Sequence, residues 1–215
     1  MGDPIDIPGG ELSIAPDLNA PLLVVFGGVD VDKIEFDGVK RKKPIFVASG
    51  SYMWNFMNDL KSRFHIFVAA NSDVHGDKAF ESLMAALKAR NIDPSQLKPK
   101  PILYLFSGGY KAGIALLGGN GPDRFSSIFL VDIWMGLGKK NPSPFVPNFY
   151  KDLVSANQDL YTYVFTSFGA NNNDARDFIA KKLGPTKAFL VERQGVEDGT
   201  QTHLRTNEVA IGEIP

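Results

Sequence analysis

The feature that most constrains this chain is a series of short apolar runs, rich in β-branched and aromatic residues, with segments of helical spacing between them. Each run is almost entirely apolar instead of alternating with polar residues, which is typical of strands covered on both faces of a parallel sheet. The runs are Leu22–Phe26, His65–Ala70, Ile102–Phe106, Ile128–Asp132, Tyr161–Thr166 and Ala188–Glu192. We therefore expect these runs to form the strands of a mostly parallel sheet.

The segments between the runs show the spacing of a helix face. Apolar residues at i, i+3, i+4 and i+7 predict one helix over Met53–Leu60 and another over Phe80–Leu87. Shorter stripes predict helices at Tyr110–Leu117, Asn148–Asn157 and Asp174–Leu183. The alternation of strands and helices predicts an α/β fold with three layers, in which helices cover both faces of a doubly wound sheet and the crossovers are right-handed.

The length of the chain and one long connection bear on its organisation. A chain of 215 residues can bury about 70% of its unfolded surface, and no repeat or linker divides it, so we expect one domain over residues 1–215.

The connection over residues 133–148 carries Trp134, Met135 and Phe145. Long connections in compact domains are often functional, and we expect this one to form the wall or lid of a pocket.

The charge balance and the lack of cysteine exclude several classes of function. With 23 basic and 24 acidic side chains, and no basic block longer than Lys40–Lys43, the chain does not have the basic face of a nucleic-acid binder. It contains no cysteine, which excludes disulfides, a thiol nucleophile and thiolate metal sites. It has neither an apolar stretch long enough for a membrane span nor the layout of a secretion signal at its start. We expect a soluble, cytoplasmic protein that binds neither nucleic acid nor membranes, and the sequence gives no indication of its oligomeric state.

One strand end has the layout of a catalytic serine. Ligands of open α/β sheets bind beyond the carboxyl ends of the strands, and the run ending at Phe106 is followed by Ser107, Gly108, Gly109 and a helical segment. A strand, a serine, a glycine two residues later and a helix make up a nucleophile elbow, whose sharp turn exposes the serine Oγ. Leu105 stands where the G-x-S-x-G pattern has its first glycine, so the motif is half matched. The alternative is that Ser107 lies in an ordinary tight loop or caps a helix.

A serine nucleophile needs a base within hydrogen-bond reach and an acid to orient that base, and the chain has three histidines. His65 opens a strand at the end of the sheet opposite the elbow, so we expect it to be structural. His75 lies at the correct end but precedes the serine. His203 lies in the polar segment 199–207, which we expect to be a loop after the last strand. We favour His203 as the base over the alternative that it is an ordinary exposed histidine.

Two carboxylates are candidates for the acid. Asp132 ends the strand that follows the serine, where a charge needs a partner, and we favour it over Asp174, which suits the cap of the next helix. An oxyanion hole would use the backbone N–H of Gly108 and a second one from the loop after an earlier strand, at Gly28 or Val29.

The remaining glycine-rich and acidic segments carry no cofactor signature. Neither the segment after Phe26 nor the elbow matches G-x-G-x-x-G or a phosphate-binding loop. The spacing of Asp30, Asp32 and Asp37 does not match a calcium loop and is typical of a solvated turn. We expect the protein to need no metal and no cofactor.

Together these residues resemble the α/β-hydrolase superfamily over most of the chain, from residue 21 to residue 207. The resemblance rests on an early strand followed by Gly27-Gly28, an elbow at Ser107, an acid after a later strand, and His203 near the end. The elbow and the strand before Asp132 are also similar to those of poorly characterised bacterial hydrolase-like proteins. The resemblance implies a mixed sheet with flanking helices and acyl-transfer chemistry. We expect no large cap domain in this chain.

The sequence thus predicts a serine hydrolase that cleaves an ester or amide bond of a small-molecule substrate. Ser107 would attack the carbonyl, His203 would take and return the proton, and Asp132 would hold the imidazole. The aromatic residues of the connection over residues 133–148 would shape a moderately apolar pocket. The alternative is a non-catalytic α/β module that binds a small ligand or a protein partner in the same crevice, and Leu105 favours that alternative.

Overall fold

The computed structural model describes residues 3–28, 49–70, 75–118, 121–133, 153, 161–167, 187–191, 195 and 199–215. The acidic segment around Asp37 and the connection from residue 134 to residue 148 lie outside these ranges. So do the helices predicted at Asn148–Asn157, except for Leu153, and at Asp174–Leu183.

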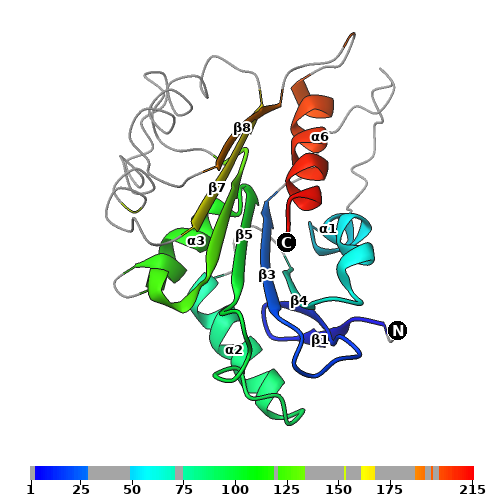
Figure 1. The fold of residues 1–215 in the computed structure, drawn as a ribbon, viewed down its shortest axis with the longest axis vertical. Helices are drawn as coiled ribbons and strands as arrows, with labels where there is room; N and C mark the ends of the chain where they lie inside the picture. Colours follow the sequence, from blue (N-terminus) through cyan, green and yellow to red (C-terminus); the bar gives the residue numbers. More distant parts are fainter. Residues whose placement is uncertain are drawn as a thin grey trace.

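In the described ranges, eight strands form one sheet that runs through the molecule (Figure 1). They are β1 (Ile5–Ile7), β2 (Gly10–Ser13), β3 (Leu22–Gly28), β4 (His65–Ala69), β5 (Ile102–Ser107), β6 (Ser127–Val131), β7 (Tyr161–Ser167) and β8 (Lys187–Val191). Their spatial order is β1-β2-β4-β3-β5-β6-β7-β8. The pairs β1–β2 and β2–β4 are antiparallel, and all other neighbouring pairs are parallel. The expectation of a mostly parallel sheet is therefore confirmed.

The apolar runs correspond to β3 through β8, with ends that differ by only one or two residues. Their composition follows from their position, because helices cover both faces and every residue of β4 and β6 is buried. The strand at Ile128–Asp132 ends one residue earlier than predicted, at Val131, since the backbone of Asp132 leaves the extended region.

The amino-terminal hairpin of β1 and β2 was not expected from the apolar pattern. These strands are short, and β1 is partly exposed, so they lack the continuous apolar run of the inner strands. Pro8 and Gly9 form the two-residue connection, and Gly9 has a φ of 91° that a side chain would oppose. The Pro-Gly pair is the local signal that could have predicted the turn.

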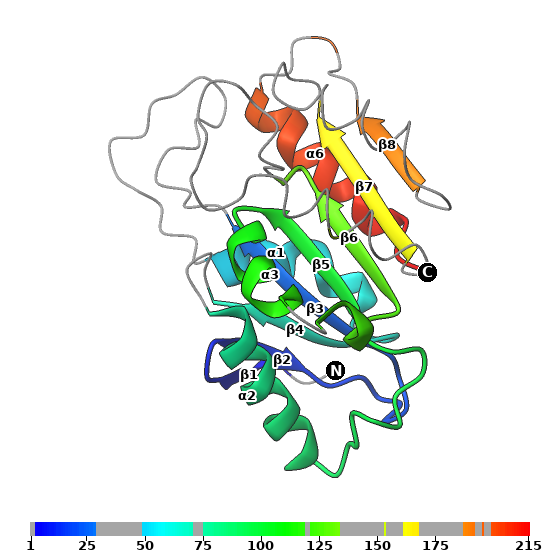
Figure 2. The same cartoon turned by 90° about the vertical axis from the view of Figure 1, so that its left-hand side faces the viewer.

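Helices cover the two faces of the sheet in separate layers (Figure 2). Helices α1 (Ser49–Met57) and α6 (Gly199–Gly212) pack on one face, and α2 (Gly76–Lys88) and α3 (Tyr110–Leu117) pack on the other. Short 3₁₀ helices, η1 (Asn58–Leu60) and η2 (Gly121–Arg124), complete the described helical elements. No helix in the described ranges is both long enough and apolar enough to cross a membrane.

Strand β5 lies between β3 and β6, and its side chains alternate between the two cores. Leu103 and Leu105 are buried in the core under α2 and α3. Tyr104 and Phe106 are buried in the core under α1 and α6. Because successive side chains of a strand point to opposite faces, this alternation determines which groups reach helix α6.

Candidate active site

The register of the sheet brings Ser107 and Asp132 to the same level at the carboxyl ends of neighbouring strands. Phe106 in β5 pairs with Gly27 in β3 on one side and with Val131 in β6 on the other. Ser107 follows Phe106 directly and Asp132 follows Val131 directly. Neighbouring strands lie about 4.8 Å apart, so the two backbones leave the sheet side by side.

Both residues adopt a backbone conformation that side chains other than glycine rarely take. The φ of Ser107 is 50° and that of Asp132 is 45°. For an L-amino acid the left-handed region is strained, and such residues cluster at functional sites. At Ser107 the strain accompanies a sharp turn from β5 into α3, which is the geometry expected of a nucleophile elbow.

The alternative that Ser107 caps a helix is wrong for this structure. The N-cap of α3 is Gly109, and no side chain caps that helix end. Ser107 is instead the last residue of β5. Its side chain is therefore not explained by helix capping.

Close packing explains the glycine two residues after the serine. A Cβ atom on Gly109 would lie 2.0 Å from the carbonyl oxygen of Phe26 and 3.0 Å from that of Phe106. The φ of Gly109 is −58°, which any residue can adopt, so contact with β3 and not backbone conformation requires glycine here. Leu105, the departure from the elbow pattern, is buried in the core under α2 and α3 and leaves the positive φ of Ser107 in place.

His203 lies in helix α6 and not in the loop that the sequence predicted. The helix was missed because its buried face is polar: Thr202, Thr206 and Asn207 are all buried. Thr206 satisfies its hydroxyl within the helix by donating to the carbonyl oxygen of Thr202 at 2.7 Å. Polar residues on the inner face conceal the apolar stripe by which a helix is recognised.

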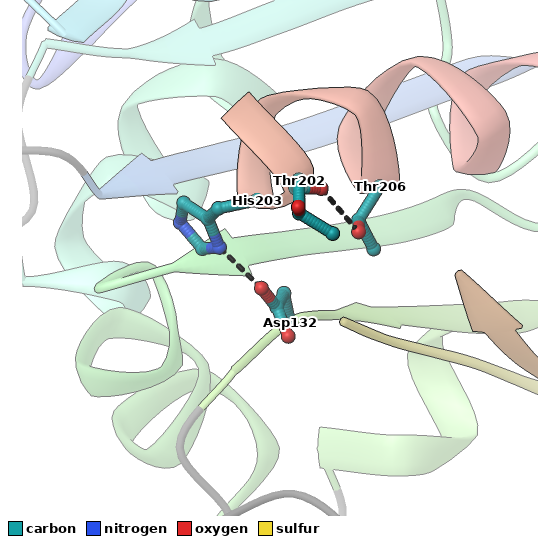
Figure 3. A network of polar contacts seen from close by, with 4 residues as sticks. All are labelled: Asp132, Thr202, His203 and Thr206. Carbon is teal, nitrogen blue, oxygen red and sulfur yellow. Dashed lines mark hydrogen bonds and ion pairs between the residues drawn. The ribbon is translucent and has the colours of Figure 1, made fainter. Parts of the chain in front are cut away.

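The imidazole of His203 contacts the carboxylate of Asp132 through Nδ1 and Oδ2 (Figure 3). The side chain of Asp132 is 4% exposed and that of His203 is 23% exposed, so the acid is enclosed and the base retains access to solvent. The ring of His203 also stacks on that of Phe106, with centroids 4.6 Å apart and planes at 26°. The backbone N–H of Asp132 donates to the carbonyl oxygen of Phe165 at 2.7 Å, which ties this acid to β7.

The other two histidines have different surroundings. His65 is fully buried; its Nδ1 accepts from the backbone N–H of Ala15 at 3.1 Å, and its Nε2 donates to the carbonyl oxygen of Leu18 at 3.2 Å. Burial lowers the pKa of His65, so the ring is neutral in the fold. Its predicted structural role is confirmed. His75 is the N-cap residue of α2, with 73% of its side chain exposed.

The remaining predicted site residues divide into two groups. Gly108 lies in the turn after Ser107, and Gly28 pairs with Ser107 in the β3–β5 ladder. Residues outside the described ranges are the second oxyanion candidate Val29, the alternative acid Asp174, and the pocket residues Trp134, Met135 and Phe145. In the part of the chain that the structure describes, no three His, Asp or Glu side chains gather as a metal site would require.

Two features of the site were not recognised from the sequence. One is the stacking of Phe106 on His203. The other is a hydrogen bond from the hydroxyl of Tyr104 to Oδ1 of Asn207, at 2.7 Å. Both pairs join β5 to α6, and no local sequence pattern links residues so far apart.

Comparison with solved structures identifies the fold. The crystal structure of naproxen esterase (carboxylesterase NP) from Bacillus subtilis matches with a TM-score of 0.57 and 11% identity, over 100% of this chain and 91% of that chain. Thermogutta terrifontis esterase 2 matches with a TM-score of 0.53 and 10% identity, over 93% of this chain and 85% of that one. The structure of 1H-3-hydroxy-4-oxoquinoline 2,4-dioxygenase matches with a TM-score of 0.54 and 13% identity, over 98% and 96%.

These matches, with further esterase and lipase structures, show that the chain has the α/β-hydrolase fold. No protein-family model matches the sequence, and the search of curated proteins finds no similar sequence. At these identities the likeness concerns the fold. Since the similar structures include a dioxygenase as well as esterases, the fold alone does not determine the reaction, which depends on the residues of the site.

Proposed function

We propose that this α/β-hydrolase-fold chain is a serine hydrolase that cleaves an ester or amide bond. In this proposal Ser107 is the nucleophile, His203 the general base and Asp132 the acid that orients the base. The single observation that carries the proposal is the contact between Asp132 and His203, two residues 71 positions apart, beside the end of the strand that bears Ser107.

Three features of the surroundings support these roles. The carboxylate is almost fully enclosed, so its charge acts on the imidazole with little screening by water. Its contact with Nδ1 holds the proton there, so that Nε2 can accept the proton of a hydroxyl. Ser107 has the strained backbone of an elbow, and a serine with no capping role is suited to face a ligand.

The proposed reaction proceeds in two halves. His203 Nε2 takes the proton of Ser107 as its Oγ bonds to the substrate carbonyl carbon, and the imidazolium then gives that proton to the departing alcohol or amine. Water hydrolyses the acyl-serine ester with His203 again as the base, which releases the acid and regenerates the hydroxyl. The N–H of Gly108, with that of Gly28 or Val29, would bind the oxyanion. Trp134, Met135 and Phe145 would shape a moderately apolar pocket for the acyl or leaving group.

A fluorophosphonate probe tests the proposal, because it reacts with an activated serine. We expect the wild-type protein to be labelled and Ser107→Ala to be unlabelled, and His203→Ala to be labelled at least a hundredfold more slowly. His75→Ala is the matched control, since it removes an imidazole that is 73% exposed and has no role in the proposed reaction, and it should leave the labelling rate unchanged.

Two results would contradict the proposal. Equal labelling of the wild type and Ser107→Ala would remove Ser107 from the nucleophile's role. A folded wild-type protein that neither reacts with the probe nor hydrolyses short p-nitrophenyl esters would favour the alternative, a non-catalytic module that binds a small ligand or a partner protein.

A further inference from the structure

Helix α6 contacts β5 at two levels, one helical turn apart. The ring of His203 lies on Phe106, and the side chain of Asn207 meets Tyr104. The two strand residues are about 6.7 Å apart along β5, and the two helix residues are about 6 Å apart along α6. Because these spacings match, the two pairs form together when the helix runs opposite to the strand.

The Tyr104–Asn207 pair differs from the Phe106–His203 pair in being directional. The Tyr104 hydroxyl donates to Oδ1 of Asn207 at 2.7 Å and lies 3.2 Å from the backbone oxygen of Asn207. The ring of Tyr104 stacks on that of Phe129, with centroids 5.8 Å apart, so the sheet determines where this hydroxyl lies. Stacked rings tolerate sliding, whereas a hydrogen bond weakens steeply when its geometry changes.

Stability alone does not account for an asparagine at this position. Tyr104 and Asn207 are both fully buried, and among the described residues Nδ2 of Asn207 is a buried donor without a hydrogen-bond partner. A buried polar atom without a partner destabilises a fold, whereas two apolar side chains of the same shape would pack here without that penalty. A buried polar pair of this kind can instead specify one alignment of neighbouring elements.

We infer that Tyr104 and Asn207 are positioning residues, which set the alignment of α6 on β5 and so hold His203 beside Asp132 and Ser107. This inference rests on the proposed role of His203 as the base. A shift of α6 by one residue would turn His203 by about 100° around the helix axis. The imidazole would then lose both the carboxylate and the ring of Phe106.

Three variants separate positioning from stability. Tyr104→Phe removes only the hydroxyl. The double variant Tyr104→Phe/Asn207→Leu replaces the pair by apolar groups and also removes the buried Nδ2. Thr206→Val is the matched control. It removes a buried hydroxyl from the same helix, but that hydroxyl donates within α6 and does not join the helix to the sheet.

The main measurement is the imidazole NMR spectrum, in which three histidines can be assigned one by one through His65, His75 and His203 variants. We expect the double variant to fold with a melting temperature near that of the wild type, but with the Nδ1 proton of His203 shifted or lost. Its labelling rate with the fluorophosphonate should fall at least tenfold. Tyr104→Phe should show the same changes to a smaller degree, and Thr206→Val should show neither.

Several results would overturn the inference. One is a double variant that folds and keeps the His203 spectrum and the labelling rate of the wild type. Another is a Thr206→Val variant whose spectrum and labelling rate change as much as those of the double variant. If neither Tyr104→Phe nor the double variant folds, the pair is required for the fold itself and is not a positioning device. Should the wild type fail to react with the probe, the proposed hydrolase function fails, and the His203 spectrum still decides whether the pair positions this ring.

Discussion

Replacing Gly109 by alanine tests how the elbow is built, because the new methyl group would meet backbone and not a movable side chain. Its Cβ would lie 2.0 Å from the carbonyl oxygen of Phe26, 2.8 Å from the carbonyl carbon of Phe26 and 3.0 Å from the oxygen of Phe106. Ordinary contact begins near 3.4 Å, so the turn and β3 must separate by about 1.4 Å, which is the difference between ordinary contact and the shortest of these distances.

The size of the effect follows from two opposing terms. Overpacking of a closely packed site typically destabilises a protein by about 1–3 kcal/mol, and a methyl group that clashes with backbone atoms belongs at the upper end of that range. Alanine is compatible with a φ of −58° and restricts the unfolded chain, which offsets about 0.5–1 kcal/mol. We expect Gly109→Ala to lower the free energy of unfolding by about 2 kcal/mol and the melting temperature by roughly 4–8 °C.

The same displacement should reach Ser107, two residues earlier in the turn. A misplacement of about 1 Å at a reacting group can reduce a rate about a hundredfold, so labelling by the fluorophosphonate should fall by about that factor. Thermal unfolding and the labelling rate are measured on the same preparations.

Two other glycines calibrate the experiment. Gly212→Ala places its methyl group where, apart from its chain neighbours and the backbone of its own helix, no atom lies within 4 Å, and this variant should be neutral or slightly more stable. Gly27→Ala meets the side chain of Met53 at 2.5 Å, which can rotate away, so its effect should be intermediate, about 1 kcal/mol. A Gly109→Ala variant as stable as Gly212→Ala, or a reversed order of the three variants, would show that close contact with β3 does not require glycine at position 109.

Three further predictions follow from the strain, the burial and the packing around the site. Ser107→Gly should abolish labelling, because the hydroxyl is lost. It should also raise the free energy of unfolding by about 1 kcal/mol in chemical denaturation, because glycine adopts a φ of 50° without strain. An unchanged or lower free energy of unfolding would mean that this backbone is not strained. Burial lowers the pKa of His65 below its unfolded value of about 6.5, so stability should be complete above that pH and should fall as the pH drops below it, since the unfolded chain binds the proton more readily. Denaturation curves between about pH 8 and about pH 5, a range that brackets the unfolded value, measure how the free energy of unfolding depends on pH. The control His75→Ala should keep this dependence. A free energy of unfolding that does not change over that range would contradict a neutral buried ring. Leu105→Gly restores the glycine of the elbow pattern but empties a fully buried position. It should therefore lose about 3–5 kcal/mol of stability, and its labelling should not become faster. Faster labelling by a stable variant would show that Leu105 restrains the elbow.

The inner part of the fold could be predicted from the sequence because strands buried on both faces have a simple composition. Strands such as β5 and β6 are covered by helices on either side, so nearly all their residues are apolar and the runs are easily recognised. Their ends then place Ser107 and Asp132 at the edge of the sheet where ligands bind, and the structure brings these backbones to the same level.

Helix α6 and the hairpin of β1 and β2 could not be predicted in the same way. The inner face of α6 contains Thr202, Thr206 and Asn207. The Thr206 hydroxyl donates inside the helix, and Oδ1 of Asn207 accepts from a strand residue 103 positions earlier in the chain. The hairpin is antiparallel and partly exposed, so its composition is mixed. In both places tertiary contacts, and not local periodicity, determine the structure.

The central strand β5 has a consequence for any attempt to transplant this site. Ser107, the ring beneath His203 and the hydroxyl that bonds Asn207 all belong to one stretch of backbone, whose other side chains fill the opposite core. Grafting loops onto another scaffold would carry over the serine and leave behind the two strand side chains that contact α6. A successful transfer would have to move the strand and its helix together, as one unit.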